Sequence, residues 1–427
     1  MNAELSWFEG TPANWPIVRT KFLFKRQQRP VREIDDIVTA FRDGQVALRR
    51  NRRTDGFTNA AKEIGYQGIR KGDLVVHAMD AFAGAVGVAE DDGKSTPVYS
   101  VCTPKRVDIF TPYYARLLRH MALSGFVESL SKGIRERSTE FRWAELSNVA
   151  LPVPPADHQE RIADFLDEQT ARIDALIVEK ERLRRSLEEF RLSAIHVALS
   201  IGLNREASTV DTGDEWFARV PAHWAFCPLN YRYEVQLGKM LDEKRITGAH
   251  LLPYLRNTDV QWDRINSESL PEMDIAPTEM PRYSVRAGDL LVCEGGEVGR
   301  AAIWEGPENT IGYQKALHRV RPRTTGDVPR FLFYALFDSA KRGRFESRDK
   351  ATIAHLTAEA FRRYRFTFPP YAEQTAIVQH LDSLTSKIDG LQRHCIEHID
   401  RLREYRSSLI SAAVTGQLDI NSYKEAA

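Results

Sequence analysis

Several side chains stand close together in patterns that carry chemistry in other proteins. The Gly-rich segment Glu294–Gly299 has the composition of a phosphate-cradling turn, but it lacks the Gly-Lys-Ser/Thr ending of a nucleotide-hydrolysing loop. His394, Cys395 and His398 lie within about one helical turn, a spacing that can hold zinc. A polar layer between two helices accounts for the same residues, because Cys395 and His398 fall on heptad positions. We therefore expect no cofactor and no metal ion.

A second stretch has the look of a catalytic motif. Phe368–Tyr371 reads Phe-Pro-Pro-Tyr, which is similar to the Pro-Pro motif of amino-methyltransferases. That chemistry needs a polar first residue to hold the amino group of a flipped base, and Phe368 offers no polar atom. The same Pro-Pro pair recurs at Pro154 and Pro155, where it suits the start of a helix. No nucleophile and base of recognisable spacing appear, so we expect a chain that is not an enzyme.

Arginine is concentrated in the short segment Arg49–Arg53, in which four of the five residues are arginine. Such a run is a candidate for phosphate contacts, and Arg50, Arg52 and Arg53 are the residues that we expect to make them. A solvated loop is the alternative. The net charge of +1 argues against an affinity that comes mainly from phosphate neutralisation, although a neutral total can hide basic and acidic faces.

These candidates lie in a sequence that occurs twice. Pro154–Ser200 aligns without gaps on Pro369–Thr415, at an offset of 215 residues. The flanks match as well, since a Pro-x-x-Trp segment and a Gly-Asp-Leu segment precede each copy. A repeat of this length indicates that the chain is a duplicated half. The matching residues include Gln159 and Gln374, Leu166-Asp167 and Leu381-Asp382, Ile173-Asp174 and Ile388-Asp389, Arg191 and Arg406, Trp15 and Trp224, and Asp73 and Asp289.

Each copy of the repeat has the pattern of one long helix. Apolar residues recur every seven positions on two tracks, which is typical of a coiled-coil seam. At a rise of 1.5 Å per residue, each helix would be on the order of 65 Å long. We expect the seam to contain Leu166, Ile173, Leu176, Leu187 and Phe190 from the first copy and Leu381, Ile388, Leu391, Leu402 and Tyr405 from the second.

The repeat predicts an α+β chain in which two globular domains of mixed sheet and helix alternate with two long helices. A tandem duplication closes most simply around a pseudo-two-fold axis, with the two helices forming an antiparallel coiled coil. We expect a domain at residues 1–153, a helix at 154–203, a linker at 204–215, a domain at 216–368, a helix at 369–420 and a tail at 421–427.

Composition sets the class of protein. A hydrophobic content of 42% with 28% charged residues is ordinary for a soluble globular chain. No run of about 18 apolar residues is present, so we expect no membrane span, and the polar start does not resemble a signal peptide. The four cysteines are scattered and form no Cys-x-x-Cys pair. This pattern favours the reducing cytoplasm.

The whole plan resembles the specificity subunit of Type I restriction-modification systems. The resemblance rests on the Pro-x-x-Trp opening of each half, the Gly-Asp-Leu strand with its Gly-rich turn, and the long helix that begins at Pro-Pro. It covers nearly the whole chain. It implies two target-recognition domains that each read one half of a bipartite site in double-stranded DNA, while the helices set the spacer. It also implies two docked modification (methyltransferase) subunits, with restriction and translocase subunits in the full complex.

The resemblance also points to the polar loop before each long helix, which in the family lies close to DNA. Carried onto this sequence, it implies that Arg side chains read base edges while Lys and Thr fix the backbone. A surface loop without a ligand is the alternative. The residues are Lys132, Arg135 and Arg137 in the first half and Arg348, Lys350 and Thr352 in the second.

Two other functions stay open from the sequence. One is a protein-interaction scaffold without any role on nucleic acid, in which the helices form a zipper. The other is an enzyme with a degenerate site, such as a fused methyltransferase, although its motifs are missing. Affinity for a split DNA sequence that depends strongly on salt would favour the DNA reader.

Overall fold

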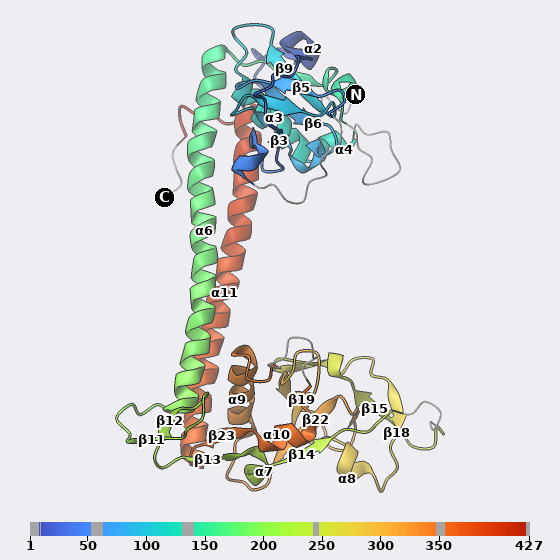
Figure 1. The fold of residues 1–427 in the computed structure, drawn as a ribbon, viewed down its shortest axis with the longest axis vertical. Helices are drawn as coiled ribbons and strands as arrows, with labels where there is room; N and C mark the ends of the chain where they lie inside the picture. Colours follow the sequence, from blue (N-terminus) through green and yellow to red (C-terminus); the bar gives the residue numbers. More distant parts are fainter. Residues whose placement is uncertain are drawn as a thin grey trace. The chain divides into compact units, whose positions relative to one another are not determined.

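The structure, a computed structural model, describes residues 8, 10–52, 63–129, 141–241, 247–346 and 355–423. The chain forms two compact units, one made of Met1–Glu181 with Ile396–Ala427 and the other of Arg182–Cys395. Helix α6 (Ala156–Ser200) begins in the first unit and ends in the second, and α11 (Tyr371–Val414) begins in the second and ends in the first (Figure 1). Each unit therefore contains the start of one long helix and the end of the other.

The first unit is built on a four-stranded antiparallel sheet in the order β2-β9-β6-β7. Helix α3 (Thr111–Leu123) packs against β7, and β1 pairs with β10 just before α6 starts. The elements before α3 are β1 (Ile17–Arg19), α2 (Thr20–Leu23), β2 (Phe24–Gln27), β3 (Val38–Ala40), β4 (Val46–Leu48), η1 (Arg49–Asn51), β5 (Gln67–Ile69), β6 (Leu74–His77), η2 (Ala81–Ala83), β7 (Val86–Val88), β8 (Gly93–Ser95) and β9 (Tyr99–Pro104). After it come α4 (Phe126–Ser129), α5 (Trp143–Leu146) and β10 (Ala150–Pro152).

The second unit repeats this topology. Its four-stranded antiparallel sheet has the order β14-β22-β19-β20, α9 takes the place of α3, and β13 pairs with β23 before α11 starts. The repeated elements are β13 (Ala225–Pro228), α7 (Leu229–Arg232), β14 (Tyr233–Leu237), β19 (Leu290–Cys293), β20 (Ala301–Ile303), β22 (Leu317–Pro322), α9 (Pro329–Lys341), α10 (Ala358–Arg363) and β23 (Arg365–Phe368). Between them lie β15 (Leu251–Leu255), η4 (Asn257–Asp259), β16 (Val260–Gln261), β17 (Arg264–Ile265), β18 (Glu272–Asp274), α8 (Met280–Tyr283) and β21 (Gly312–Tyr313).

The repeated Gly-Asp-Leu segment forms the same turn in both units. Gly72 and Gly288 adopt φ values of +90° and +88°, a region that glycine enters without steric cost. The next residue closes the turn, because the backbone N–H of Arg70 donates to Asp73 and that of Arg286 donates to Asp289, each at 2.8 Å. Both aspartates are buried. Their side chains pair with arginines on neighbouring strands or turns, Arg29 for Asp73 and Arg321 for Asp289.

A buried glutamine joins each long helix to the shorter helix of its unit. In the first unit Gln159 accepts a hydrogen bond from the N–H of Phe110, at 2.8 Å, and donates to the carbonyls of Asp108 and Pro154. In the second unit Gln374 accepts from the N–H of Val328, at 2.9 Å, and donates to the carbonyl of Pro369. Phe110 and Val328 are the N-caps of α3 and α9, so each amide serves N–H groups that a helix start leaves unpaired.

The helix ends are closed by the repeated tryptophans. Gly416 and Gly202 adopt φ values of +74° and +80°, as expected for glycine just beyond a helix. A Cβ atom would meet the ring of Trp15 at 2.7 Å in the first case and that of Trp224 at 2.8 Å in the second. The Pro-x-x-Trp segment therefore packs on the end of a long helix, and no side chain fits between them.

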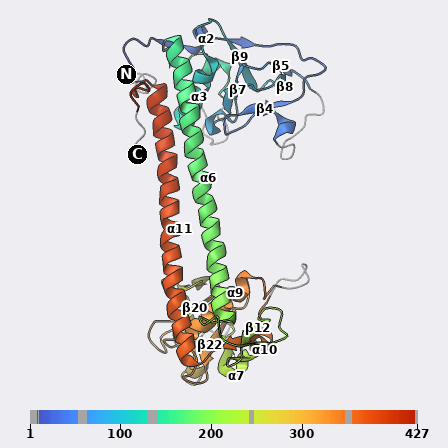
Figure 2. The same ribbon diagram turned by 90° about the vertical axis from the view of Figure 1, so that its left-hand side faces the viewer.

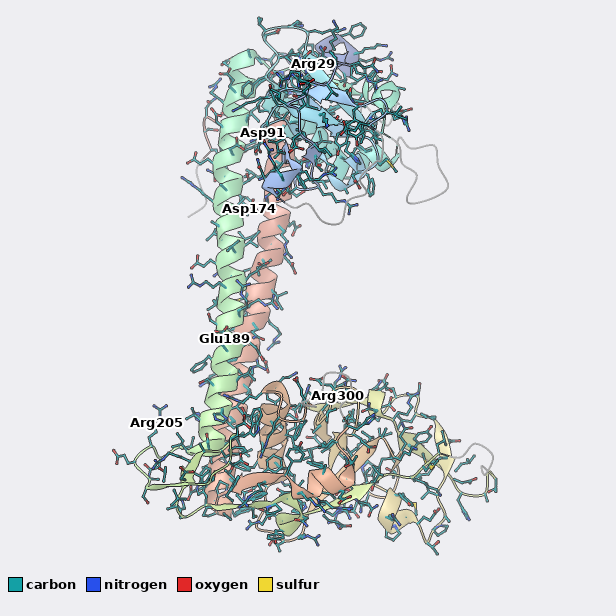
Figure 3. The ribbon with its side chains drawn as sticks, in the orientation of Figure 1. Arg29, Asp91, Asp174, Glu189, Arg205 and Arg300 are labelled. Atoms are coloured by element: carbon teal, nitrogen blue, oxygen red, sulfur yellow. The ribbon has the colours of Figure 1, made fainter. Side chains whose placement is uncertain are left out.

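The two long helices lie side by side and run antiparallel within each unit (Figures 1 and 2). In the first unit Asp174, labelled in Figure 3, lies 3.0 Å from the Nε of Arg406. In the second, Asp389 pairs with Arg191. These are the Ile-Asp and Arg positions of the repeat, so the same ion pair fixes the helix register in both units.

Two parts of the chain are more ordered than we expected. The predicted linker 204–215 contains β11 (Thr209–Asp211), which pairs with β12 (Arg219–Pro221). The predicted tail also packs where it is described, because the ring of Tyr423 meets Phe165 edge-on and its hydroxyl bonds to that of Tyr405. Local polarity predicted a linker and a tail, but a short antiparallel hairpin orders part of the first and contacts with both long helices order Tyr423.

We predict that Gln374→Ala destabilises the second unit by about 2–4 kcal/mol, because the N–H of Val328 and the carbonyl of Pro369 lose a buried partner. Thermal unfolding of the full chain should show a transition about 5–10 °C lower. Gln379→Ala, an exposed position on the same helix, is the matched control and should leave that transition within about 1 °C. Equal transitions in the two variants would mean that the buried amide contributes nothing.

Candidate functional site

The basic segment of the first unit follows the β3–β4 hairpin directly. Arg50 is exposed and lies 3.1 Å from Asp36. Arg52 lies 2.6 Å from Asp43 and places its guanidinium over the ring of Phe41, at 4.5 Å. Arg53 lies outside the described residues. The hairpin thus brings Arg50 and Arg52 to one surface, where each already has a carboxylate partner.

The ion pair between Arg52 and Asp43 shifts the pKa of both side chains. Burial raises the pKa of the Asp43 carboxyl, but hydrogen bonds from Arg52 and the N–H of Gln45 outweigh burial and lower the pKa overall. The hydrogen bond to Asp43 raises the pKa of Arg52. Both groups are therefore charged at neutral pH, and any phosphate that binds Arg52 must displace a carboxylate that is itself ionised.

A cavity of about 710 Å³ opens beside this segment. His77, at the end of β6, accepts a hydrogen bond at Nδ1 from the N–H of Asp80, at 3.0 Å, and meets the ring of Tyr99 edge-on. Burial lowers the pKa of His77. The neutral ring therefore carries its proton on Nε2 and offers one donor. Arg42, Arg49, Arg52, Thr39 and Thr96 are among the other side chains of this cavity.

Phe141, the first described residue after the gap at 130–140, is held just beyond the end of strand β6. The N–H of Phe141 donates to the carbonyl of Ala78, the residue after β6, at 2.9 Å. The predicted loop residues of the first half (Lys132, Arg135 and Arg137) lie outside the described residues.

The second unit forms the same hydrogen bond at the equivalent residue, Leu356. The N–H of Leu356 donates to the carbonyl of Glu294, the residue after β19, at 2.8 Å. Ala78 and Glu294 hold the same position of the repeat, because each is the second residue after the Leu-Val-Val or Leu-Leu-Val core of its strand. The predicted loop residues of the second half (Arg348, Lys350 and Thr352) lie outside the described residues.

His318 forms a further hydrogen bond to Leu356. Its Nε2 donates to the carbonyl of Leu356 at 2.6 Å. Burial lowers the pKa of His318 to about 4, so the ring is neutral at pH 7. No signal in the sequence pointed to His318, because it lies on β22 and meets Leu356 only through folding.

The Gly-rich turn of the second unit is a packing feature. Gly296 and Gly299 adopt φ values of +73° and +83°. A Cβ atom on Gly299 would lie 2.5 Å from the ring of Phe345, and the carbonyl of Gly295 accepts a hydrogen bond from Asn257 at 3.0 Å. The turn therefore places its backbone against residues that flank the predicted loop. Asn257 is a second residue that sequence reasoning missed.

The two apolar tracks of the long helices differ in their exposure to solvent. Leu166, Ile173, Leu381 and Ile388 are buried, and Leu187 and Leu402 are half-buried. The other track, which we also expected in the seam, lies at the surface: Leu176 is 44% exposed, Phe190 55%, Leu391 51% and Tyr405 44%. A straight α-helix has 3.6 residues per turn, so two helices alone cover one stripe and leave the second at the rim.

The exposed residues form a groove in the first unit. Its volume is about 420 Å³, and its walls include Leu176 from α6 and Tyr405 from α11. The offset of the repeat places Leu391 at the position of Leu176 and Phe190 at the position of Tyr405. The second unit therefore exposes the equivalent pair, one residue on each helix.

The possible zinc ligands do not converge. Cys395 is buried, whereas His394 and His398 are exposed on the same helix. Within the part of the chain that the structure describes, no group of three or more metal-ligating side chains is present. No helix among the described residues is long and apolar enough to cross a membrane.

Comparison with known proteins shows which family this chain resembles. The model of the Type I restriction modification DNA specificity domain matches residues 240–401. The chain is 22% identical to the EcoKI specificity subunit of Escherichia coli strain K12, over 74% of this chain and 68% of that protein. It is 21% identical to the EcoBI specificity subunit of Escherichia coli, over 73% and 68%. The chain is therefore similar in sequence to specificity subunits of Type I restriction-modification systems.

Solved structures share the fold. A chain from the study entitled "Structural basis underlying complex assembly and conformational transition of the type I R-M system" aligns with a TM-score of 0.71 at 16% identity, over 96% of this chain and 99% of that one. The HsdS subunit from Thermoanaerobacter tengcongensis aligns with a TM-score of 0.62 at 17% identity, over 96% and 98%. The α+β class with two globular domains and paired long helices is thereby confirmed.

Proposed function

We propose that this specificity subunit is a non-catalytic DNA reader in which each globular domain reads one half of a bipartite site. The anchored loop carries the proposal. In both units the N–H of a residue that follows the predicted loop, Phe141 or Leu356, donates to the first carbonyl after the repeated strand, which supports one framework for two loops. The loop sequences differ, with Lys132, Arg135 and Arg137 in one and Arg348, Lys350 and Thr352 in the other. Two loops of different sequence on the same framework would read two different half-sites.

Arg50 and Arg52 would add contacts to the phosphate backbone. They lie at one surface after the β3–β4 hairpin and are held by Asp36 and Asp43. A guanidinium that exchanges a carboxylate for a phosphate keeps its charge-assisted hydrogen bonds, so the exchange costs little. The net charge of +1 fits a reader whose affinity comes from a few such exchanges.

We predict that the double variant Arg50→Ala/Arg52→Ala binds DNA more weakly at every sequence. The slope of log affinity against log salt should fall by about two, because about one counterion-releasing contact is lost per arginine. Binding isotherms at several salt concentrations measure this. Arg363→Ala, which removes an arginine that is 77% exposed on α10, is the control and should keep the slope. An unchanged slope in the double variant would place the phosphate contacts elsewhere.

The long helices would set the spacing between the half-sites. α6 has 45 residues and α11 has 44, and ion pairs at repeated positions fix their antiparallel register. A pair of long helices bends little over its length, so its length can define a separation.

We predict that removing one heptad from α6 and one from α11, between the two ion pairs, changes the unread spacer of the target. Sequencing of the methylated sites in cells that carry the shortened chain measures the spacer, and the bases of both half-sites should stay the same. A chain with seven residues replaced at the same places, at unchanged length, is the control. An unchanged spacer in the shortened chain would contradict the proposal.

The exposed apolar pairs on the helices would bind the modification subunits. Leu176 with Tyr405 and Leu391 with Phe190 are equivalent pairs on the repeat, and each side chain is 44–55% exposed. Large exposed apolar residues at helical spacing are typical of docking surfaces. Two equivalent surfaces favour two copies of one methyltransferase subunit. Methylation and cleavage chemistry would then belong to the modification, restriction and translocase partners, and we expect the complex in the cytoplasm.

We predict that Leu176→Glu and Leu391→Glu each remove one methyltransferase subunit from the purified complex and that the double variant removes both. A buried carboxylate without a partner would weaken each contact by at least about tenfold. Native mass spectrometry counts the subunits. Val178→Glu, at a 61% exposed position of α6 outside the groove, should keep both copies. Two copies retained in the double variant would rule these surfaces out.

The scaffold alternative shares the docking surfaces but not the DNA contacts. If methyltransferase subunits bound normally and no DNA sequence were preferred at any salt concentration, the scaffold would be the better account.

A further inference from the structure

A second cavity in the first unit lies between α3, the β3–β4 hairpin, β7 and the long helices. Its volume is about 660 Å³. Five cationic side chains and three carboxylates line it, which leaves a surplus of two positive charges. The cations are Lys71, Arg116, Arg119, Arg403 and Arg406, and the carboxylates are Asp43, Glu90 and Asp167.

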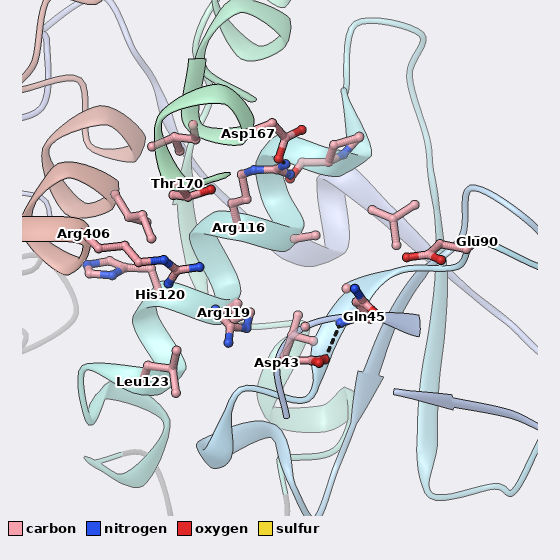
Figure 4. Close-up of a pocket in the computed structure, with 18 of the residues that line it drawn as sticks. Asp43, Gln45, Glu90, Arg116, Arg119, His120, Leu123, Asp167, Thr170 and Arg406 are labelled. Atoms are coloured by element: carbon pink, nitrogen blue, oxygen red, sulfur yellow. Dashed lines mark hydrogen bonds and ion pairs between the residues drawn. The ribbon is translucent and has the colours of Figure 1, made fainter. Parts of the chain in front are cut away.

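Arg119 stands near the centre of this cavity (Figure 4). Its Nε donates to the carbonyl of Gly84 at 3.2 Å and its Nη2 to the carbonyl of Arg42 at 3.1 Å. Within the described residues it forms no ion pair with a carboxylate. Burial, and then the charge of Arg406, lower the pKa of Arg119. The side chain stays charged, because a guanidinium does not lose its proton in proteins. The fold thus holds a half-buried cation beside a like charge, and Asp43 and Asp174 act on it only through their charges.

The other arginines of the cavity are already paired. Arg116 binds Asp167, and Arg406 binds Asp174 at 3.0 Å. Arg403 lies 3.3 Å from Asp400. The remaining lining carboxylates form no ion pair with Arg119, since Asp43 hydrogen-bonds Arg52 and acts on Arg119 only through its charge, and Glu90 lies on the far side of the cavity in Figure 4. An anion would therefore find Arg119 open on its cavity side.

The second unit fills the same place with an aromatic side chain. α3 and α9 each have 13 residues, and their N-caps bind equivalent glutamines, so Phe337 holds the position of Arg119 and Tyr334 that of Arg116. The ring of Phe337 meets Trp262 edge-on, with centroids 5.0 Å apart. The shared framework does not require a charged cavity here. Arg119 is a feature that only the first unit has.

We propose that this cavity binds a small phosphate-bearing molecule of nucleotide size, with a phosphate group between Arg119 and Arg406. A guanidinium fork matches the geometry of phosphate oxygens, and the volume falls in the range of small-molecule sites. The wall formed by Val86, Leu166 and Ile410 is aliphatic and would face the less polar part of the ligand.

Calorimetric titration of the full chain, without DNA, tests the proposal with pyrophosphate and with ADP as probes. We expect both to bind with one site per chain. Arg119→Gln should weaken binding by at least about tenfold, because a charge-assisted hydrogen bond is lost. Arg363→Gln should bind as the unchanged chain does. Absence of binding by both probes, or equal binding by Arg119→Gln, would overturn the proposal.

Leu123→Glu provides a second variant that does not depend on a buried position. Leu123 lines the cavity and is 51% exposed, so a carboxylate there should leave the fold intact by circular dichroism while it competes with the phosphate. We expect at least about a tenfold loss of pyrophosphate affinity. A short DNA duplex forms the last arm. If Leu123→Glu weakened only duplex binding and neither small probe bound, the phosphate would come from DNA and this proposal would be wrong.

Discussion

Each globular unit depends on one constraint: its hydrophobic core is completed by the start of one long helix and the end of the other. In the first unit Ile162 and Leu166 of α6 pack in the same core as Ala413 and Val414 of α11. In the second unit Ile377 and Leu381 of α11 pack with Ala198 and Leu199 of α6. Burial of these side chains removes apolar surface from water, which is the main stabilising term in folding. Neither unit has a complete core until both long helices are in place.

The same constraint explains which parts of the repeat stay alike. The hydroxyl of Tyr113 donates to the last-turn carbonyl of Val414, at 2.7 Å, and the hydroxyl of Thr367 does the same for Leu199, at 2.7 Å. Val414 and Leu199 hold the same repeat position, yet the donors come from different elements. What the two units share is the need to satisfy the carbonyls at a helix end. The side chain that meets this need is free to differ, as it is at Arg119 and Phe337.

The sequence predicted the long helices and the internal repeat well, because periodic and repeated residues form both. Heptad spacing located α6 and α11, and the repeat singled out Gln159, Gln374 and the matching Asp and Arg positions, but it did not predict that the Asp and Arg side chains pair. It did not show that Leu176 and Phe190 would be exposed, since periodicity gives the stripe and not the number of helices that cover it. Asn257, His318 and Arg119 carry no local signal. Their importance comes from contacts with residues that lie far along the chain.

The paired arginines on the β3–β4 hairpin have a consequence for how such a protein would search a genome. Each of three arginines there already forms an ion pair with a carboxylate, in the position that a phosphate would take. The pairs are Arg50–Asp36, Arg52–Asp43 and Arg42–Asp80. On contact with any stretch of duplex, a DNA phosphate would replace a carboxylate at each arginine, with little net change in free energy. The protein would then leave non-target sequences quickly. It would stay longest where contacts to base edges add binding free energy to the phosphate contacts. Built-in counterions of this kind would favour fast scanning over tight, indiscriminate attachment.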